Sequence, residues 1–144
     1  ASAHSVKSGV THFSSKNEAA CILDIKRLLT YIPSNCEEEP PRLPYEMNGD
    51  EVVPALDDIL PDNPNQPYDI KDVIKGVVDK GSFFEVHEKF ADNIVVGFAH
   101  LAGRSIGIVA NQPMSMAGVL DNDCSKKAAR FVRFCDAFNI PLLV

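Results

Sequence analysis

The sequence has no tryptophan, no long apolar run and no excess of positive charge. Its 14 lysines and arginines are outnumbered by 20 acidic residues, which gives a net charge of −6. An acidic chain without a basic run lacks the features that hold a nucleic-acid backbone, so we expect no nucleic-acid partner. No apolar run approaches the ~20 residues that cross a bilayer. No amino-terminal signal pattern is visible either, and the sequence therefore predicts a cytoplasmic protein without a membrane span.

The four cysteines and four histidines do not form the pattern of a metal site. No CxxC pair, HExxH motif or zinc-type histidine–cysteine spacing is present, so we expect no metal ion in this fragment. We expect reduced thiols at Cys21, Cys36, Cys124 and Cys135. We expect solvated or hydrogen-bonded imidazoles at His4, His12, His87 and His100.

The sequence evidence for a catalytic nucleophile is equally weak. Ser8, Ser125 and Cys135 could attack a carbonyl, but none lies in a GxSxG elbow, and Ser125 is better interpreted as a helix cap. The acidic run at residues 37–39 lies among prolines, where a solvated stretch is the usual outcome. The residues alone therefore identify no catalytic group.

The first half of the chain divides into a helix and a proline-rich segment. Residues 15–18 match a capping box, and apolar residues then recur at helical spacing from Ile22 to Ile32, where Pro33 stops the helix. Residues 33–67 hold most of the ten prolines and the Asn48-Gly49 pair. We interpret this stretch as an extended linker at a domain boundary, with one helical turn near residues 55–59.

The second half alternates helices and strands. A helix is predicted from the N-cap Asp69 to Gly81. Its expected buried face consists of Ile70, Val73, Ile74, Val77 and Val78.

Two β-rich runs follow, at residues 93–99 and 104–110, and a short turn joins them into a predicted hairpin. A further helix is predicted over 125–138. Residues 140–144 then indicate the start of a strand that is buried on both faces. Because that strand has no turn or polar tail after it, we expect the chain to be an internal fragment.

One loop has the position of a ligand site. Asn111, Gln112 and Pro113 follow a buried strand and lead through Gly118 towards a helix. Open α/β folds bind ligands at such strand ends, and backbone amides there could face an anionic oxygen. The alternative is that the asparagine and the proline simply end the strand. Spacing alone leaves both interpretations open.

Several segments resemble the carboxyltransferase subunits of biotin-dependent acyl-CoA carboxylases. The longest are residues 93–98 (NIVVGF), 107–113 (GIVANQP) and 129–142 (ARFVRFCDAFNIPL), with shorter matches at 8–12, 68–70, 78–79 and 83–85. They run in the right order over nearly the whole chain. The most similar members are propionyl-CoA carboxylase β chains and the methylmalonyl-CoA decarboxylase and transcarboxylase subunits.

The resemblance implies an α/β fold of the crotonase type, built from two lobes that are each a β-β-α superhelix. Residues 1–62 would be the closing helices of the amino-terminal lobe together with the linker. Residues 63–144 would open the carboxy-terminal lobe, so the fragment would span the junction of the two.

The resemblance also implies the chemistry. These subunits move carboxylate between biotin, which is carried by a partner protein, and the α-carbon of an acyl-CoA such as propionyl-CoA or methylmalonyl-CoA. The implied partners are a biotin carboxyl carrier or biotin carboxylase subunit and further copies in a homo-oligomer.

The resemblance does not supply catalytic residues. The glycines that form the two oxyanion holes would lie before Ala1 and after Val144. We therefore expect the full-length subunit to be the enzyme and this fragment to be inactive. Residues 111–118 would correspond, by internal repeat, to a ligand-facing loop of the other lobe. Ala110 stands where many relatives have glycine. A non-catalytic CoA-binding or assembly module is the alternative function.

Overall fold

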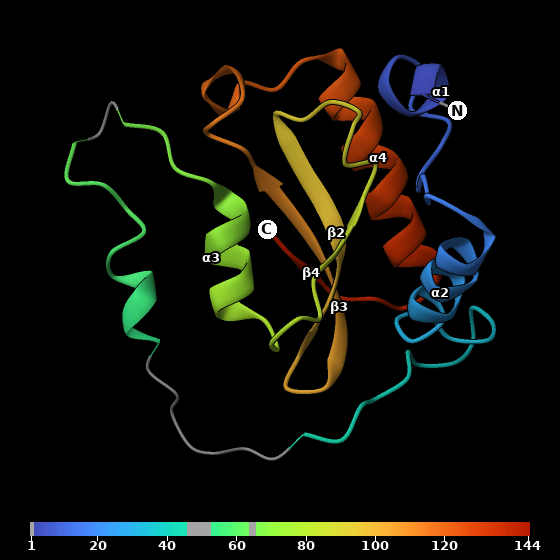
Figure 1. Cartoon of the computed structure of the whole chain (residues 1–144). Helices are drawn as coiled ribbons and strands as arrows, with labels where there is room; N and C mark the ends of the chain where they lie inside the picture. The colour runs from blue at the N-terminus through green and yellow to red at the C-terminus, as the bar shows by residue number, and fades with distance from the viewer. Residues whose placement is uncertain (1, 46–52, 64–65) are drawn as a thin grey trace.

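A computed structural model describes residues 2–45, 53–63 and 66–144 (Figure 1). The Asn48-Gly49 pair of the predicted linker lies outside the described residues. The helices are α1 (Ser2–Val6), α2 (Glu18–Leu28), α3 (Ile70–Val77) and α4 (Asn122–Ala137). The strands are β1 (Phe84–Val86), β2 (Ile94–Leu101), β3 (Arg104–Asn111) and β4 (Leu142–Leu143), and the short 3₁₀ turns are η1 (Pro54–Leu56) and η2 (Met116–Gly118).

The strands form one sheet in the order β1-β2-β3-β4. The first three are antiparallel neighbours, whereas β4 pairs parallel to β3 after the α4 crossover. Helix α4 covers one face of the sheet and α3 covers the other (Figure 1). The described residues therefore build three layers, with the sheet in the middle.

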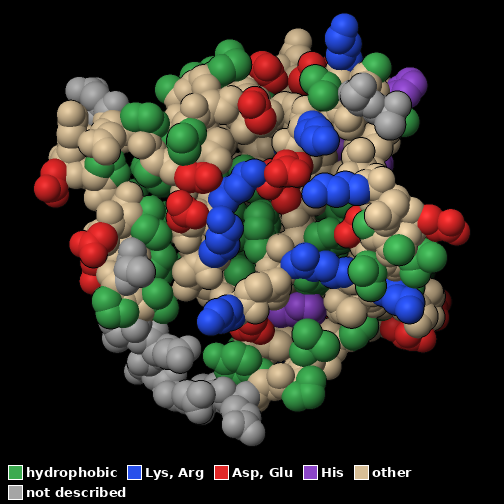
Figure 2. All heavy atoms as spheres, in the orientation of Figure 1, with side chains coloured by type: hydrophobic (Ala, Val, Ile, Leu, Met, Phe, Trp, Pro, Cys, Tyr) green, Lys and Arg blue, Asp and Glu red, His purple; other side chains and the backbone are tan. Residues whose placement is uncertain are grey.

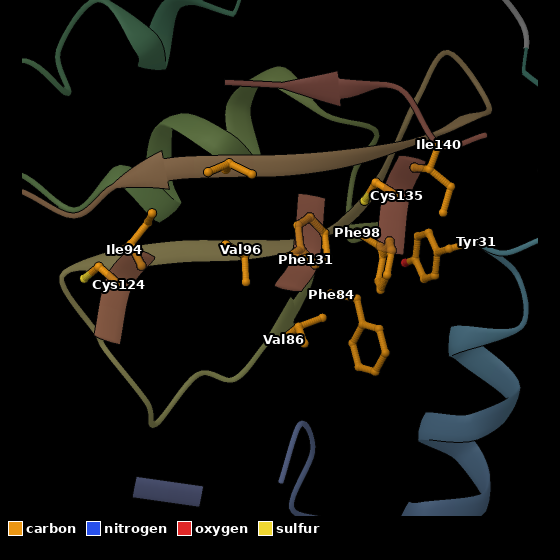
Figure 3. Close-up of a cluster of buried hydrophobic side chains, with 11 residues drawn as sticks. Tyr31, Phe84, Val86, Ile94, Val96, Phe98, Cys124, Phe131, Cys135 and Ile140 are labelled. Atoms are coloured by element: carbon orange, nitrogen blue, oxygen red, sulfur yellow. The ribbon is translucent and has the colours of Figure 1, made fainter. Parts of the chain in front are cut away.

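The main core lies between the sheet and α4 (Figure 3). Successive side chains of a strand point to opposite faces, so Val96 and Phe98 of β2 face α4 while Val95 and Ala99 face α3. Because both faces are covered, β2 is buried from Ile94 to His100. This explains the unbroken apolar run in its sequence.

Tyr31 joins the amino-terminal segment to the same core. Its side chain is only 2% exposed and stacks on His100, with the ring centroids 4.5 Å apart. Its hydroxyl donates to the Ser82 carbonyl, and its own carbonyl accepts from the Ser105 hydroxyl at 2.7 Å. The segment that follows α2 is thus held against β2 and β3. The predicted division at residue 62 stays a prediction.

The predicted cap and end of α2 were wrong. Asn17 is the N-cap, and its side chain accepts from the Ala20 amide at 2.9 Å, whereas the Ser15 hydroxyl donates to Asp24 at 2.6 Å. The helix ends at Leu28 rather than Ile32, because the chain turns there to bring Tyr31 into the core. None of the described residues Glu18–Leu28 is buried, so the apolar side chains of α2 lie largely at the surface.

The predicted hairpin is confirmed in position. Leu101 pairs with Arg104 across a two-residue turn, in which Ala102 and Gly103 both have positive φ. The carboxylate of Asp79 accepts from both turn amides, at 2.9 and 2.8 Å. A side chain from the end of the α3 region therefore fixes the hairpin turn.

The helices beside the hairpin were predicted less accurately. Asp69 is the N-cap of α3 as expected, but Val77 is 42% exposed and does not belong to the buried face. Helix α4 begins at Asn122, and its N-cap is Asp121 rather than Ser125. The Asp121 carboxylate accepts from the Cys124 amide at 2.8 Å, which satisfies one of the free amides at the helix start.

The edges of the sheet also differ from expectation. Strand β1 was not predicted, because three residues are too few for a periodic signal. Strand β4 lies where a strand was expected, but Leu142 and Leu143 are 38% and 42% exposed rather than buried. Only Ile140, before the strand, enters the core. The 3₁₀ turn at Pro54–Leu56 overlaps the helical turn expected near residues 55–59.

Candidate functional site

The candidate site is the loop that joins β3 to α4, residues 111–120, which we call the strand-end loop. Its centre is the 3₁₀ turn, where Met116, Ala117 and Gly118 have φ of 48°, 52° and 72°. Left-handed backbone is unfavourable for residues other than glycine, so two such residues in a row need support from their surroundings.

That support comes from the short segment before β2, residues 90–94, which we call the 90–94 turn. The Asn93 side chain donates to the Val119 carbonyl at 2.6 Å. The backbone carbonyl of Asn93 accepts from the backbone N–H of Gln112 at 3.0 Å. The Asp92 carboxylate accepts from the Ser115 hydroxyl at 2.9 Å. The 90–94 turn thus holds the start, the middle and the end of the strand-end loop.

Gln112 connects the loop to the start of α3. Its side chain donates to the Asp69 carboxylate at 2.7 Å and accepts from the Ile70 amide at 3.2 Å. Burial by itself would raise the pKa of Asp69, but the bonds from Gln112 and from the Lys71 amide outweigh it and lower that pKa. Asp69 is therefore an ionised helix cap that also anchors the loop.

The four predicted site residues lie together but differ in their surroundings. Gln112 and Gly118 are buried, Pro113 is half-buried and Asn111 is exposed. The Asn111 side chain donates to the Gly118 carbonyl at 2.7 Å, so it closes the loop on itself. Both side-chain amides are committed to internal bonds. A ligand would therefore meet the loop backbone and the exposed side chains Met114 and Met116.

A hollow of about 460 Å³ lies between α2, α3 and β1, on the face shown in Figure 2. Lysine and arginine side chains gather there with acidic side chains between them. Lys71 and Glu85 pair at 2.6 Å across it. Arg27 donates to the carbonyls of Gly81 and Phe83 at 3.0 and 2.8 Å, so its charge is already used to join α2 to the segment before β1.

Two histidines meet at the edge of this hollow. The rings of His12 and His87 lie 4.0 Å apart, and His87 is only 3% exposed. Neither ring nitrogen of His87 has a hydrogen-bond partner among the described residues, which contradicts the expectation of a satisfied imidazole. Burial, together with the neighbouring His12, lowers the pKa of His87 to about 4. His100 does meet the expectation, because its ring contacts the Thr30 carbonyl at 3.3 Å.

The two buried cysteines, Cys124 and Cys135, offer no reactive thiolate, because burial raises the pKa of each. All four cysteines are free in the part of the chain that the structure describes. Cys124 and Cys135 are buried, and burial raises the pKa of the Cys135 thiol to about 12. No three described histidine, cysteine or acidic side chains come together as a metal site. None of the described helices is long and apolar enough to cross a membrane.

Sequence reasoning missed the residues that hold the site. Asp69 was identified as a cap but not as the partner of Gln112, and Asp92 and Asn93 were not singled out. The only sequence signal for the latter two is their position just before a strong strand. Their role depends on tertiary pairing with a loop about 20 residues further along the chain.

A family match covers the chain from end to end. Residues 1–144 match the sequence profile described as "Carboxyl transferase domain". The chain belongs to this family. The resemblance found in the segments 93–98, 107–113 and 129–142 is thereby confirmed.

Curated members of the family are similar over almost all of this chain. The propionyl-CoA carboxylase carboxyltransferase subunit of Haloferax mediterranei is 53% identical over 143 residues. The propionyl-CoA carboxylase beta chain of Roseobacter denitrificans is 49% identical, and the methylmalonyl-CoA decarboxylase subunit alpha of Veillonella parvula is 48% identical. Each match covers 99% of this chain but 28% of the relative.

Solved structures agree with the fold. The transcarboxylase 12S structure, a hexamer with methylmalonyl-coenzyme A and methylmalonic acid bound, superposes with a TM-score of 0.94 at 45% identity, covering 99% of this chain and 27% of that one. A single-chain long-chain acyl-CoA carboxylase, 23% identical, shares the fold with a TM-score of 0.81, covering 98% of this chain and 14% of that one. The expected α/β carboxyltransferase fold of the crotonase type is confirmed.

Proposed function

We propose that this chain is part of a carboxyltransferase subunit of a biotin-dependent acyl-CoA carboxylase. The subunit moves carboxylate between biotin and the α-carbon of propionyl-CoA or methylmalonyl-CoA. The observation that carries the proposal is the 53% identity to a propionyl-CoA carboxylase subunit across 143 residues. The chain spans about a quarter of the length of its relatives, so the activity belongs to the whole subunit.

The proposed reaction leaves negative charge on oxygen. Removal of a proton or a carboxylate from the α-carbon of a thioester gives an enolate, and loss of carboxylate from biotin leaves a charged ureido oxygen. Oriented backbone amides stabilise such oxygens more than side chains that must reorganise. We propose that the strand-end loop, with Asn111, Gln112, Pro113 and Gly118, is one wall of the ligand site and that its backbone faces a ligand.

The proposed cofactors and partners follow from the reaction. Biotin would arrive on a carrier protein, and the acyl group would arrive as a coenzyme A thioester. A homo-oligomer is supported by the similarity to transcarboxylase 12S, which is a hexamer and is 45% identical to this chain. A cytoplasmic location belongs to the same proposal.

The direct test is carboxyl transfer by the full-length subunit. The subunit is incubated with methylmalonyl-CoA labelled in its free carboxylate and with free biotin, and labelled carboxybiotin is measured. We expect label in biotin and release of propionyl-CoA. Absence of transfer to biotin from methylmalonyl-CoA, and from malonyl-CoA in its place, would overturn the proposal.

The effect of coenzyme A on Tm distinguishes the enzyme from the alternative function. A non-catalytic CoA-binding or assembly module would be stabilised by coenzyme A without transferring carboxylate. A preformed site stabilises the fold by mass action, by about 2.7 kcal/mol at 100 times Kd. A rise in Tm with coenzyme A and no labelled biotin would therefore favour that alternative over the enzyme.

A further inference from the structure

Lys127 is a charged residue in the interior of the described chain. It lies on α4 and is 2% exposed. Its ammonium donates to the carbonyls of Phe90 and Ile94, both at 2.7 Å, and of Ala91 at 3.1 Å. An ammonium loses its hydration when buried, so it persists only where such bonds replace the water. Three hydrogen bonds from one cation therefore join α4 to the 90–94 turn.

The turn that Lys127 holds is the turn that holds the strand-end loop. In the sequence, Asp92 and Asn93 lie between Ala91 and Ile94, whose carbonyls Lys127 binds. These two residues contact the loop at Gln112, Ser115 and Val119. The loop needs such support, since its centre has left-handed backbone at two residues that are not glycine. One chain of contacts thus runs from the ammonium through the turn to the loop.

We propose that Lys127 is a positioning residue for carboxyl transfer, which sets the strand-end loop through the 90–94 turn without touching a ligand. The proposal rests on the proposed function, because the position of the loop matters for the reaction only if the loop faces a ligand. Losing the ammonium leaves three buried carbonyls without their donor. The 90–94 turn then shifts or loosens, and the hydrogen bonds from Asp92 and Asn93 no longer hold the strand-end loop in position.

The first test measures the loop itself. Amide hydrogen exchange is followed by mass spectrometry in the full-length subunit for Lys127→Met, which keeps most of the apolar stem and removes the ammonium, and for Lys126→Met. Lys126 is the matched control, because it lies next along α4 with an exposed amine that pairs with Asp123. We expect exchange over residues 111–120 to rise roughly tenfold in Lys127→Met, with α4 and β2 unchanged and Lys126→Met like the wild type.

Two results would overturn the proposal. An unchanged loop would show that the contacts through the turn do not carry the effect. An equal rise over α4 and β2 would show that Lys127 only stabilises the fold. Neither readout depends on activity, so the exchange result stands even if the wild-type subunit transfers no carboxylate and the proposed function fails.

The second test asks whether the cation itself is required. Lys127→Ala leaves a small cavity lined by the same carbonyls, which ammonium or methylammonium can enter. Because a misplacement of about 1 Å can cost on the order of 100-fold in rate, we expect kcat/KM for transfer to fall roughly 10- to 100-fold. We expect added methylammonium to restore part of it in Lys127→Ala and to have no effect on the wild type. Normal transfer by both Lys127 variants, in a subunit that is otherwise active, would overturn the positioning role.

Discussion

The sheet core and the strand-end loop are neighbours in sequence but are stabilised in different ways. Strand β3 is held by eight register pairs with β2 and by apolar contacts on both of its faces. The loop that follows it has exposed methionines, a left-handed turn and a few hydrogen bonds from side chains outside the loop. Apolar burial has no preferred direction, whereas single hydrogen bonds fix direction and distance. The core therefore supplies stability, and the bonds from Asp69, Asp92 and Asn93 supply position.

This difference separates two kinds of damage. A core substitution should lower the stability of the whole chain, because the buried contacts are shared by the sheet and α4. A loop substitution should leave the core folded and change the local conformation.

Phe98→Ala should cause the largest loss. The Phe98 ring is 3% exposed and lies against Tyr31 and Phe131, with ring centroids 5.8 and 5.1 Å away. Removing such a ring costs about 3–5 kcal/mol through lost burial and the cavity that remains. Leu101→Ala, at a 40% exposed position of the same strand, should cost less than about 1 kcal/mol. Urea unfolding at one protein concentration measures both, and equal losses would contradict a core centred on Phe98.

Acidification should weaken the fold at His87. The pKa of His87 is about 4 in the folded chain, below the ordinary 6.5, because the buried imidazole is kept neutral. The contribution of His87 is therefore complete above pH 6.5 and is lost as the pH falls from 6.5 towards 4, up to about 3 kcal/mol. His12 and His100 shift in the same direction for the same first reason, burial.

The pH effect is isolated by replacing one ring at a time. Unfolding free energy is measured at pH 7 and pH 5 for the wild type, for His87→Met and for His4→Met, in which the replaced ring is exposed. We expect the loss between these pH values to shrink in His87→Met and to persist in His4→Met. An identical loss in all three proteins would show that His87 is not the group responsible.

Gly97→Ala should damage the contact between β1 and β2. A Cβ at Gly97 would lie 2.6 Å from the Phe84 carbonyl oxygen and 2.9 Å from the Glu85 Cα, which are backbone atoms that cannot rotate away. We expect a cost of about 1–3 kcal/mol. Gly81→Ala is the comparison, since it has φ +73° but no described atom within 4 Å of the added Cβ, and should cost about 1 kcal/mol. Thermal unfolding that ranks Gly81→Ala as the worse variant would contradict the observed packing.

Gln112→Met should have the smallest effect on stability and a selective effect on the loop. It removes the bond to Asp69 and the acceptor for the Ile70 amide, a loss of about 1–2 kcal/mol. In the full-length subunit, carboxyl transfer should fall by more than this stability loss explains, because the loop is released from α3. A drop in Tm with unchanged kcat/KM would show that the loop position does not matter for the reaction.

The sequence predicted the parts of the fold that depend on local pattern. The hairpin of β2 and β3 and the start of α3 at Asp69 follow from two β-rich apolar runs, a turn and a cap, all of which lie within a few residues. The end of α2 did not follow, because Tyr31 leaves the helix to reach Ser82 and Ser105 far along the chain. The start of α4 was missed because the serine at 125 and the aspartate at 121 are both good caps, and only geometry separates them.

The four predicted site residues lie in one loop, and their role at a ligand site stays a prediction; the bonds that hold the loop were not predicted. The strand-end position identified Asn111 and Gln112, yet their amides are internal anchors of the loop rather than free groups. The anchors Asp92, Asn93 and Lys127 come from other elements and have no local signature. The family resemblance, in contrast, was readable from continuous segments such as residues 129–142, because similarity along the sequence needs no tertiary information.

The separation of core and loop is tested most directly by hydrogen exchange with ligands present. The full-length subunit is compared alone, with coenzyme A thioester and with biotin added, and peptides from residues 94–110 and 111–120 are followed. We expect ligand to slow exchange over the strand-end loop while β2 and β3 stay unchanged. Protection confined to other segments, with the loop unaffected by either ligand, would contradict the proposal that this loop is part of the ligand site.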